Sequence, residues 1–375
     1  MKIRAPKPTG EYAVGTFTYT VKDVREEVMA PGTMRSVAAR VYYPALPESA
    51  EGMKRAESMS KNVTAGIKRA FHLPLNYEKI TASGENTAEC YENAPQIEGK
   101  KFPLILFNHG LCSYREGNSF LCIELASHGY VVISVAHSME AACTEFDDGS
   151  VILYDKSITK KTYQPFLKAA AAMYRFTKMK GSEQELAGKF GEIQRKYARF
   201  LGERLDEWVK DNEAALTYAV ENLQELIDFE KGIGATGLSM GGNTAYRLCT
   251  RKPEVVCGVN IDGGIFGDFT EDILEKPFLQ ISCKDNENVA SRVYLRHTKP
   301  VYKALFRDMR HMGFSDMKHM MKPGYTMGRL DPDDMHGNLC SCHLEFFDTY
   351  LKGLKNEPDI KSNDVITVRV YEPDM

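Results

Sequence analysis

The chain has no long apolar run and almost no excess of charge of either sign. Among its 375 residues, no stretch approaches the roughly 18 consecutive apolar residues that a membrane-spanning helix needs, so we expect no integral membrane contact. Lysine and arginine number 48 and aspartate and glutamate 51, which leaves a net charge of −3. This balance indicates neither nucleic acid nor anionic lipid as an electrostatic partner, and no membrane-seeking basic helix stands out.

Recognisable targeting signals are also missing from the first residues. Residues 1–8 contain no apolar core of a signal peptide, and Lys2 stands where myristoylation requires glycine. The nine cysteines are odd in number and scattered through apparent core segments, which is typical of reduced thiols rather than a disulfide framework. We therefore expect a cytoplasmic protein.

One short motif, Cys340 to His343, has the residue types of a metal site. It has no second pair of ligands at the spacing that zinc sites use, and on an expected helix its side chains face different ways. We therefore expect neither a metal nor an organic cofactor.

The most informative segment of the chain runs from Ile233 to Gly242. Gly237 and Gly241 flank Ser239 in the pattern G-x-S-x-G, after a short apolar run and before a helix-compatible segment. This pattern is typical of a strained strand-to-helix elbow that exposes a serine hydroxyl above a sheet. The backbone N–H of the next residue, Met240, points into such a site at the positive end of the helix. We predict Ser239 as a nucleophile and the Met240 amide as an oxyanion donor.

A second motif follows the continuous apolar run at 102–107, which predicts a strand buried on both faces of a parallel sheet. The run ends in Asn108-His109-Gly110-Leu111. A turn after such a strand is where serine hydrolases of the α/β class place their second oxyanion donor. We predict that this donor is the amide of Leu111 and that His109 supports the turn.

Strands and helices alternate along most of the chain after residue 100. Apolar runs of strand length fall at 103–107, 130–135, 233–238, 255–261 and 277–283. This alternation predicts an α/β fold with a doubly wound, mostly parallel sheet. We expect a single α/β-hydrolase domain over 1–375, with insertions at about 45–100 and a helical cap at about 156–231.

Within the expected cap, Ser182 and Glu185 form a capping-box pattern that predicts the start of a helix. Apolar residues at helical spacing over 204–230 predict a second helix that packs on the sheet, with Trp208 in the core. The part that precedes this second helix, 162–200, exceeds what a crossover needs and is expected to cover the site.

The residues alone leave both the acid and the base open. The histidines that follow Ser239 along the chain are His297, His311, His319, His336 and His343. An α/β-hydrolase places nucleophile, acid and histidine in that order along the chain. Asp262 and Asp285 each follow an expected strand. His311 also follows a strand, whereas His336 precedes the last expected helix, and both are common places for the base.

The chain resembles the platelet-activating-factor acetylhydrolase family, whose members are α/β-hydrolases, over most of residues 36–353. Residues 108–111 resemble its S-H-G-L, and 125–132 resemble its L-A-S-H-G-[FY]-x-V. Residues 237–242 match G-H-S-F-G-G, with Leu238 in place of the usual histidine.

This resemblance implies an acid and a base. Asp262 fits the L-D that carries the family's acid, and His311 begins a match to H-x-x-F-x-D, which carries the base. The resemblance therefore favours Asp262 over Asp285 and His311 over His336. The aromatic-rich segment that follows the acid in the family differs here, so the pockets are expected to differ too.

These features predict a serine carboxylic-ester hydrolase that works through an acyl-enzyme. Its expected substrates are small-molecule or lipid esters with short-to-medium acyl groups, including phospholipids like platelet-activating factor. The alternatives are an amidase or an aromatic or polymeric ester hydrolase on the same triad, and a non-catalytic binding protein on the same fold.

Overall fold

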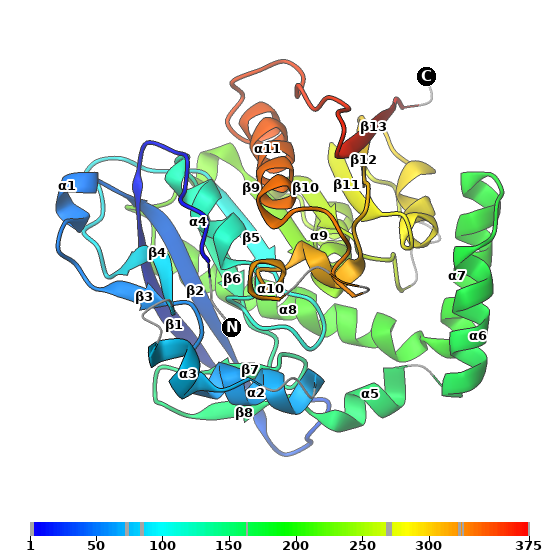
Figure 1. The fold of residues 1–375 in the computed structure, drawn as a ribbon, viewed down its shortest axis with the longest axis horizontal. Helices are drawn as coiled ribbons and strands as arrows, with labels where there is room; N and C mark the ends of the chain where they lie inside the picture. The colour runs from blue at the N-terminus through cyan, green and yellow to red at the C-terminus, as the bar shows by residue number, and fades with distance from the viewer. Residues whose placement is uncertain are drawn as a thin grey trace. The chain divides into compact units, whose positions relative to one another are not determined.

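The computed structural model describes residues 4–71, 75–82, 86–162, 164–267, 272–321, 324 and 326–373 (Figure 1). The chain divides into two compact units. The first comprises Met1–Tyr154, Lys210–Ile233 and Ser315–Lys322, and the second Asp155–Val209, Gly234–Phe314 and Pro323–Met375.

The first unit contains a sheet of both parallel and antiparallel strands. Its strands are β1 (Ala13–Glu26), β2 (Met34–Ala45), β3 (Arg55–Glu57), β4 (Thr87–Glu92), β5 (Leu104–Asn108) and β6 (Val131–Val135). β5 and β6 pair in parallel, β6 and β1 each pair antiparallel with β2, and β4 and β3 continue the sheet beyond β1. Every residue of β5 and β6 is buried, as expected for strands covered on both faces.

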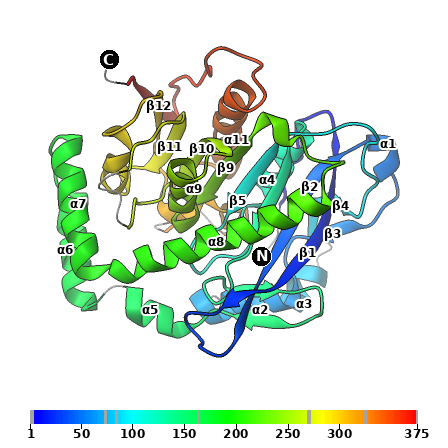
Figure 2. The same cartoon turned by 180° about the vertical axis from the view of Figure 1, so that it is seen from behind.

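Helices cover both faces of this first sheet. The helix α4 (Ser119–Ser127) lies on one face and the later part of α8 (Arg199–Asn222) on the other, as the opposite views in Figures 1 and 2 show. On the α8 face, Tyr19 of β1 stacks on Tyr218, with ring centroids 4.1 Å apart. The unit also contains α1 (Pro47–Ala50), α2 (Lys61–Phe71), α3 (Tyr77–Ala82), α10 (Met317–Met320) and the hairpin of β7 (Cys143–Glu145) and β8 (Val151–Leu153).

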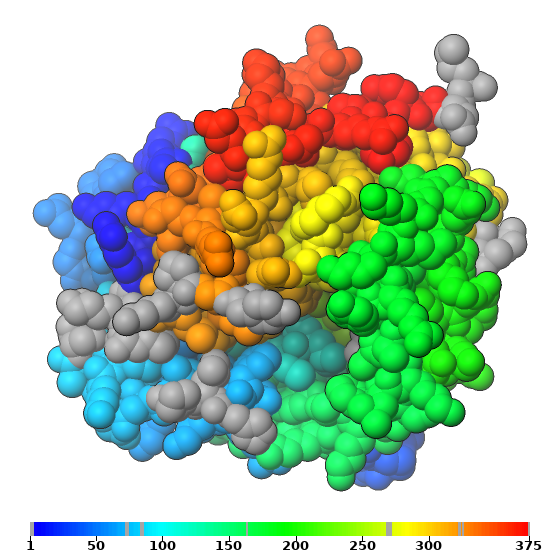
Figure 3. Space-filling model, turned by 45° about the vertical axis from the view of Figure 1, so that its right-hand side comes forward, coloured from blue at the N-terminus to red at the C-terminus, as the bar shows by residue number. Residues whose placement is uncertain are grey.

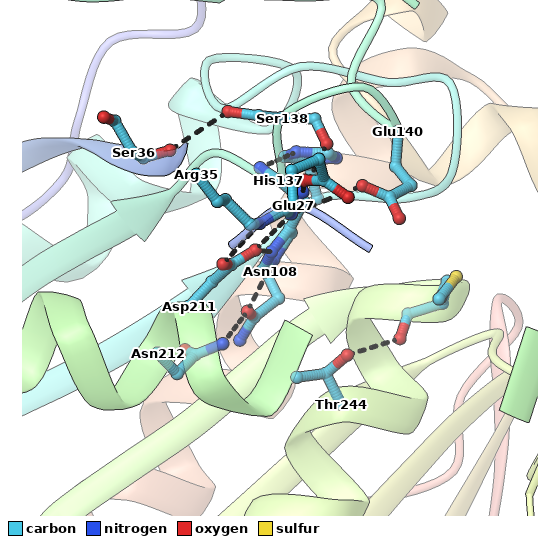
Figure 4. A network of polar contacts seen from close by, with 12 residues as sticks. Glu27, Arg35, Ser36, Asn108, His137, Ser138, Glu140, Asp211, Asn212 and Thr244 are labelled. Atoms are coloured by element: carbon cyan, nitrogen blue, oxygen red, sulfur yellow. Dashed lines mark hydrogen bonds and ion pairs between the residues drawn. The ribbon is translucent and has the colours of Figure 1, made fainter. Parts of the chain in front are cut away.

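A buried ion pair ties the first β-strands to α8 (Figure 4). The Arg35 guanidinium donates to both carboxylate oxygens of Asp211, at 2.8 and 2.6 Å, and both side chains are fully buried. Burial disfavours the charged carboxylate, but the charge of Arg35 outweighs burial and holds the pKa of Asp211 well below its usual range. Arg35 also pairs with Glu27 and Glu140, and Asp211 also pairs with Arg25, at 2.7 Å.

The second unit carries the other main strands. They are β9 (Ile233–Leu238), β10 (Val255–Ile261), β11 (Phe278–Cys283), β12 (Val301–Phe306) and β13 (Ile366–Tyr371). β11 pairs in parallel with both β10 and β12, whereas β13 closes this edge in the antiparallel direction. The helices α9 (Met240–Arg251) and α11 (Pro332–Tyr350) cover opposite faces of these strands, which is the doubly wound arrangement (Figures 1 and 2).

The described residues of the predicted cap form several α-helices, followed by a 3₁₀ turn at Phe229–Lys231. The α-helices are α5 (Lys156–Thr162), α6 (Phe166–Thr177), α7 (Glu183–Tyr197) and α8. The capping box is confirmed, because the Ser182 and Glu185 side chains each bond to the other's backbone N–H at the start of α7. The position of Trp208 in the core is confirmed as well, since its side chain is fully buried.

The structure also refines these predictions. The segment 156–231 is divided at Val209, since Asp155–Val209 belongs to the second unit and Lys210–Ile233 to the first. The single-domain organisation therefore stays a prediction. No helix among the described residues is long and apolar enough to cross a membrane.

The buried Arg35–Asp211 pair gives a test of stability. Replacing Asp211 with asparagine leaves a buried guanidinium without its main counter-charge, so Asp211→Asn should lower the free energy of unfolding by about 3 kcal/mol. Asp206→Asn is a matched control on the same helix, because Asp206 pairs with Arg247 but remains 56% exposed. It should cost less than about 1 kcal/mol. Urea unfolding measures both values. Similar losses in the free energy of unfolding for the two variants would contradict the stabilising role of the Arg35–Asp211 pair.

Candidate active site

Ser239 lies on a sharp turn between β9 and α9. Its backbone has φ of 59° and ψ of −116°, a conformation that side-chain-bearing residues rarely adopt. Close packing holds the turn in place. A Cβ added at Gly242 would overlap the Asn260 side chain, and one added at Gly263 would overlap the carbonyl of Ser239. The predicted strand–turn–helix is therefore present, with the serine at its bend.

His311 lies between Ser239 and Asp262. Its Nε2 is 3.0 Å from Ser239 Oγ, and its Nδ1 is 2.7 Å from Asp262 Oδ2. A carboxylate can only accept, so Nδ1–H donates to Asp262 and leaves the Nε2 lone pair facing the serine hydroxyl. This is the arrangement in which an imidazole can take the hydroxyl proton.

Asp262 follows β10, is fully buried, and is held by groups at the end of the neighbouring strand β11. The backbone N–H of Cys283 donates to Oδ1 at 2.7 Å, and the Asn286 side chain donates to Oδ2 at 2.9 Å. The thiol of Cys283 also donates to Oδ2, at 3.3 Å. Burial and the nearby Asp262 charge raise the pKa of this thiol, so it stays protonated and can act as a donor. These contacts satisfy a carboxylate that water does not reach.

The sequence analysis missed both Cys283 and Asn286. A signal was present, because both residues lie at or just beyond the carboxyl end of an expected strand. Carboxyl ends of parallel strands meet at one edge of a sheet, where sites are usually built. What the residues did not show is which strand lies next to β10.

The alternative acid and base have other partners. Asp285 forms an ion pair with Arg310, and its side chain is 46% exposed. His336 lies on α11, where its ring contacts the sulfur of Cys340 at 3.5 Å. The structure therefore brings Ser239, Asp262 and His311 together, whereas Asp285 and His336 have other neighbours.

The two predicted oxyanion donors lie in different units. Met240 is the first residue of α9, where a backbone N–H has no partner within the helix. Leu111 lies in the first unit, in the turn after β5. Its share in an oxyanion hole stays a prediction.

The turn that carries Leu111 is firmly supported. His109 Nε2 accepts the backbone N–H of His137 at 3.1 Å, so its Nδ1–H donates to the carbonyl of Gly110 at 2.8 Å. Burial and the neighbouring His137 lower the pKa of His109 to about 3, so the ring is neutral and can accept this bond. These contacts fit a supporting role for His109.

The buried network of Figure 4 reaches the same turn. The ring nitrogens of His137 lie 2.9 Å from Asp211 Oδ2 and 3.0 Å from Asn108 Oδ1. The carbonyl of Glu140 accepts the backbone N–H of Cys112 at 2.9 Å. Asn108, before the turn, is thus linked through His137 to Asp211, and Cys112, after it, is linked through Glu140 to Arg35.

In the candidate metal motif on α11, His343 forms hydrogen bonds with other groups of the protein. His343 is buried, with Nδ1 2.7 Å from the carbonyl of Leu339 and Nε2 3.1 Å from the hydroxyl of Thr236. Among the described residues, no group of three or more His, Cys, Asp or Glu side chains is placed to hold a metal.

Comparison with known families identifies the chain's relatives. The family model of platelet-activating factor acetylhydrolase, isoform II, matches residues 1–303. The chain belongs to this family. Platelet-activating factor acetylhydrolases of Canis lupus familiaris and Bos taurus are each 26% identical to it, over 273 and 296 residues. These matches cover 69% and 75% of this chain but only 55% and 60% of the relatives' own length.

A solved structure shows the same fold. A ferulic acid esterase from Streptomyces cinnamoneus superposes with a TM-score of 0.66 and covers 96% of both chains at 18% identity. This likeness, together with the mostly parallel strands and the helices on both faces, confirms the predicted α/β-hydrolase fold.

The two candidate acids can be separated by the same substitution. Asp262→Asn removes the acceptor that fixes the His311 ring, and it should lower kcat by about 10⁴. Asp285→Asn is the matched control at the end of the next strand. It should lower kcat by far less, because Asp285 pairs with Arg310. Steady-state hydrolysis of a soluble ester measures both, and a reversed order of effects would assign the acid to Asp285.

Proposed function

We propose that this chain is a serine carboxylic-ester hydrolase in which Ser239 is the nucleophile, His311 the base and Asp262 the acid. The observation that carries the proposal is the line of hydrogen bonds from the buried carboxylate through the imidazole to a serine on a strained elbow. Membership of the acetylhydrolase family supports it.

The proposed reaction passes through an acyl-enzyme. Ser239 Oγ attacks the ester carbonyl while its proton moves to Nε2 of His311, and Asp262 stabilises the resulting imidazolium. The amides of Met240 and Leu111 stabilise the oxyanion, each by about 3 kcal/mol. The imidazolium then gives its proton to the departing alkoxide. Water, deprotonated by the same imidazole, attacks the acyl-enzyme and releases the acid.

We propose short-to-medium acyl esters as substrates, including phospholipids that resemble platelet-activating factor. The segment 263–267, directly after the acid, is held against the cap helix α7. Phe266 makes an edge contact with Phe190, with centroids 5.3 Å apart. Gln194 donates to the carbonyl of Ile265 and accepts from the backbone N–H of Gly267.

These contacts bear on the acyl length that the site accepts. Because the segment 263–267 is fixed beside the acid, we propose that the acyl pocket is closed by a rigid wall and is not an open groove. A rigid end limits how far an acyl chain can extend.

The identity of the nucleophile can be tested by covalent labelling. A fluorophosphonate should form one adduct, on Ser239, because only a serine activated by an imidazole attacks phosphorus readily. Ser239→Ala should abolish labelling and lower kcat by several orders of magnitude while the thermal melting temperature stays close to that of the wild type. Peptide mapping by mass spectrometry locates the adduct, and heat-denatured protein is the control. An adduct on another serine would exclude this assignment.

Acyl preference can be tested with a series of p-nitrophenyl esters from acetate to palmitate. Each methylene that enters the pocket adds about 0.8 kcal/mol, so kcat/KM should rise about fourfold per carbon until the chain meets the end wall. It should then fall sharply. EDTA should leave every rate unchanged, because the proposed chemistry uses no metal.

The same panel can include a feruloyl ester and a p-nitroanilide. Preference for the feruloyl ester would favour an aromatic ester hydrolase. Preference for the anilide would favour an amidase. A rate that continues to rise through palmitate would contradict the end wall, and loss of activity in EDTA would contradict the metal-free mechanism.

A further inference from the structure

The helix α6 has apolar side chains on two sides. One side packs on the neighbouring helix, where Phe176 stacks on Phe190 of α7 with ring centroids 5.4 Å apart. The other side carries large apolar side chains that are mostly exposed: Phe166 by 63%, Leu167 by 81% and Tyr174 by 68%. Figure 3 shows the green-coloured α6 and α7 region at the surface.

The exposed side chains form one continuous stripe. Leu167, Ala171 and Tyr174 follow each other at spacings of four and three residues, which places them on one face of a helix. Phe166 and Ala170 lie beside them and are also exposed. Scattered exposed apolar residues are ordinary, whereas a stripe along one helix indicates a contact surface.

This helix is held in place by its other side. The Asn288 side chain donates to the carbonyls of Phe176 and Met179, at 3.2 and 2.9 Å, and so ties the end of α6 to the body of the second unit. The exposed side chains of the stripe therefore lie on a helix that is held in position by its other side.

The stripe lies within the most one-sided stretch of charge in the cap. Residues 156–181 contain seven cations and no carboxylate, although acidic residues outnumber basic ones in the whole chain. All seven cationic side chains are exposed: Lys156, Lys160, Lys161, Lys168, Arg175, Lys178 and Lys180. The near-neutral charge balance of the whole chain therefore does not extend to this segment.

We propose that α6, together with the lysines of α5, docks on an anionic lipid surface. Phe166, Leu167 and Tyr174 enter the boundary between headgroups and acyl chains, and the flanking cations contact the lipid phosphates. Pairing with a second copy of this chain through the same face is disfavoured, because it would bring two sets of seven cations together. This surface function goes beyond the proposed hydrolysis.

Vesicle co-sedimentation of the full chain tests the docking surface. The Ser239→Ala variant is used, so that binding is measured without hydrolysis. It should bind vesicles of phosphatidylcholine with 30% phosphatidylglycerol and bind pure phosphatidylcholine at least tenfold more weakly. Leu167→Asp should reduce the partition coefficient at least tenfold. Neutralising Lys168 and Arg175 to glutamine should reduce it about fivefold for each cation removed.

Leu354→Asp is the matched control, because Leu354 is 66% exposed and lies outside the cap. It should leave vesicle binding unchanged. In the Ser239-containing protein, Leu167→Asp should leave hydrolysis of p-nitrophenyl acetate unchanged, so that the docking proposal and the catalytic proposal fail separately.

Three results would overturn the docking proposal. The first is equal binding to neutral and anionic vesicles, or no binding to either. The second is an equal loss of binding in Leu354→Asp. The third is a dimer, seen by light scattering, that Leu167→Asp dissociates.

Discussion

A buried carboxylate must be given hydrogen-bond donors, and the site around Asp262 is built by meeting that requirement. The donors come from the end of β11, which pairs in parallel with β10 so that Ile261 faces Ile281. This register places the Cys283 amide and the Asn286 side chain against the carboxylate. The Oδ2 atom of the carboxylate also accepts from the His311 ring, which in turn faces Ser239. The geometry of the site thus depends on the pairing of two strands.

The same requirement shapes the first unit. Asp211 is as buried as Asp262, and it is paired with Arg35 and His137. His137 then joins Asn108 and His109, which precede the turn that carries Leu111. A buried ion pair contributes little net stability over an apolar core, but it fixes the relative positions of the groups that it joins. Here those groups are a strand, a helix and the predicted oxyanion turn.

Local patterns predicted those parts of the molecule whose structure is set by neighbouring residues. The elbow around Ser239, the buried strand before Leu111 and the capping box at Ser182 all follow from short motifs. The partners of Asp262 could not be predicted, since Cys283 and Asn286 reach it only through the order of strands. The residues alone also left Asp262 and Asp285 as equal choices, and the family resemblance selected between them. Asp285 differs from Asp262 in having Arg310 as a partner, which sequence order does not show.

The cap helices show a related limit of sequence patterns. α6 is apolar on two sides, so the periodicity of its residues does not tell which side packs inward and which stays exposed. Packing against α7 determines which side of α6 is buried. Phe190 of α7 contacts both Phe176 of α6 and Phe266 beside the acid. That one aromatic side chain links the helix carrying the exposed stripe to the segment that follows Asp262. A cap fixed in this way can vary its outer face without disturbing the site, because the contacts that support the site lie on its inner face.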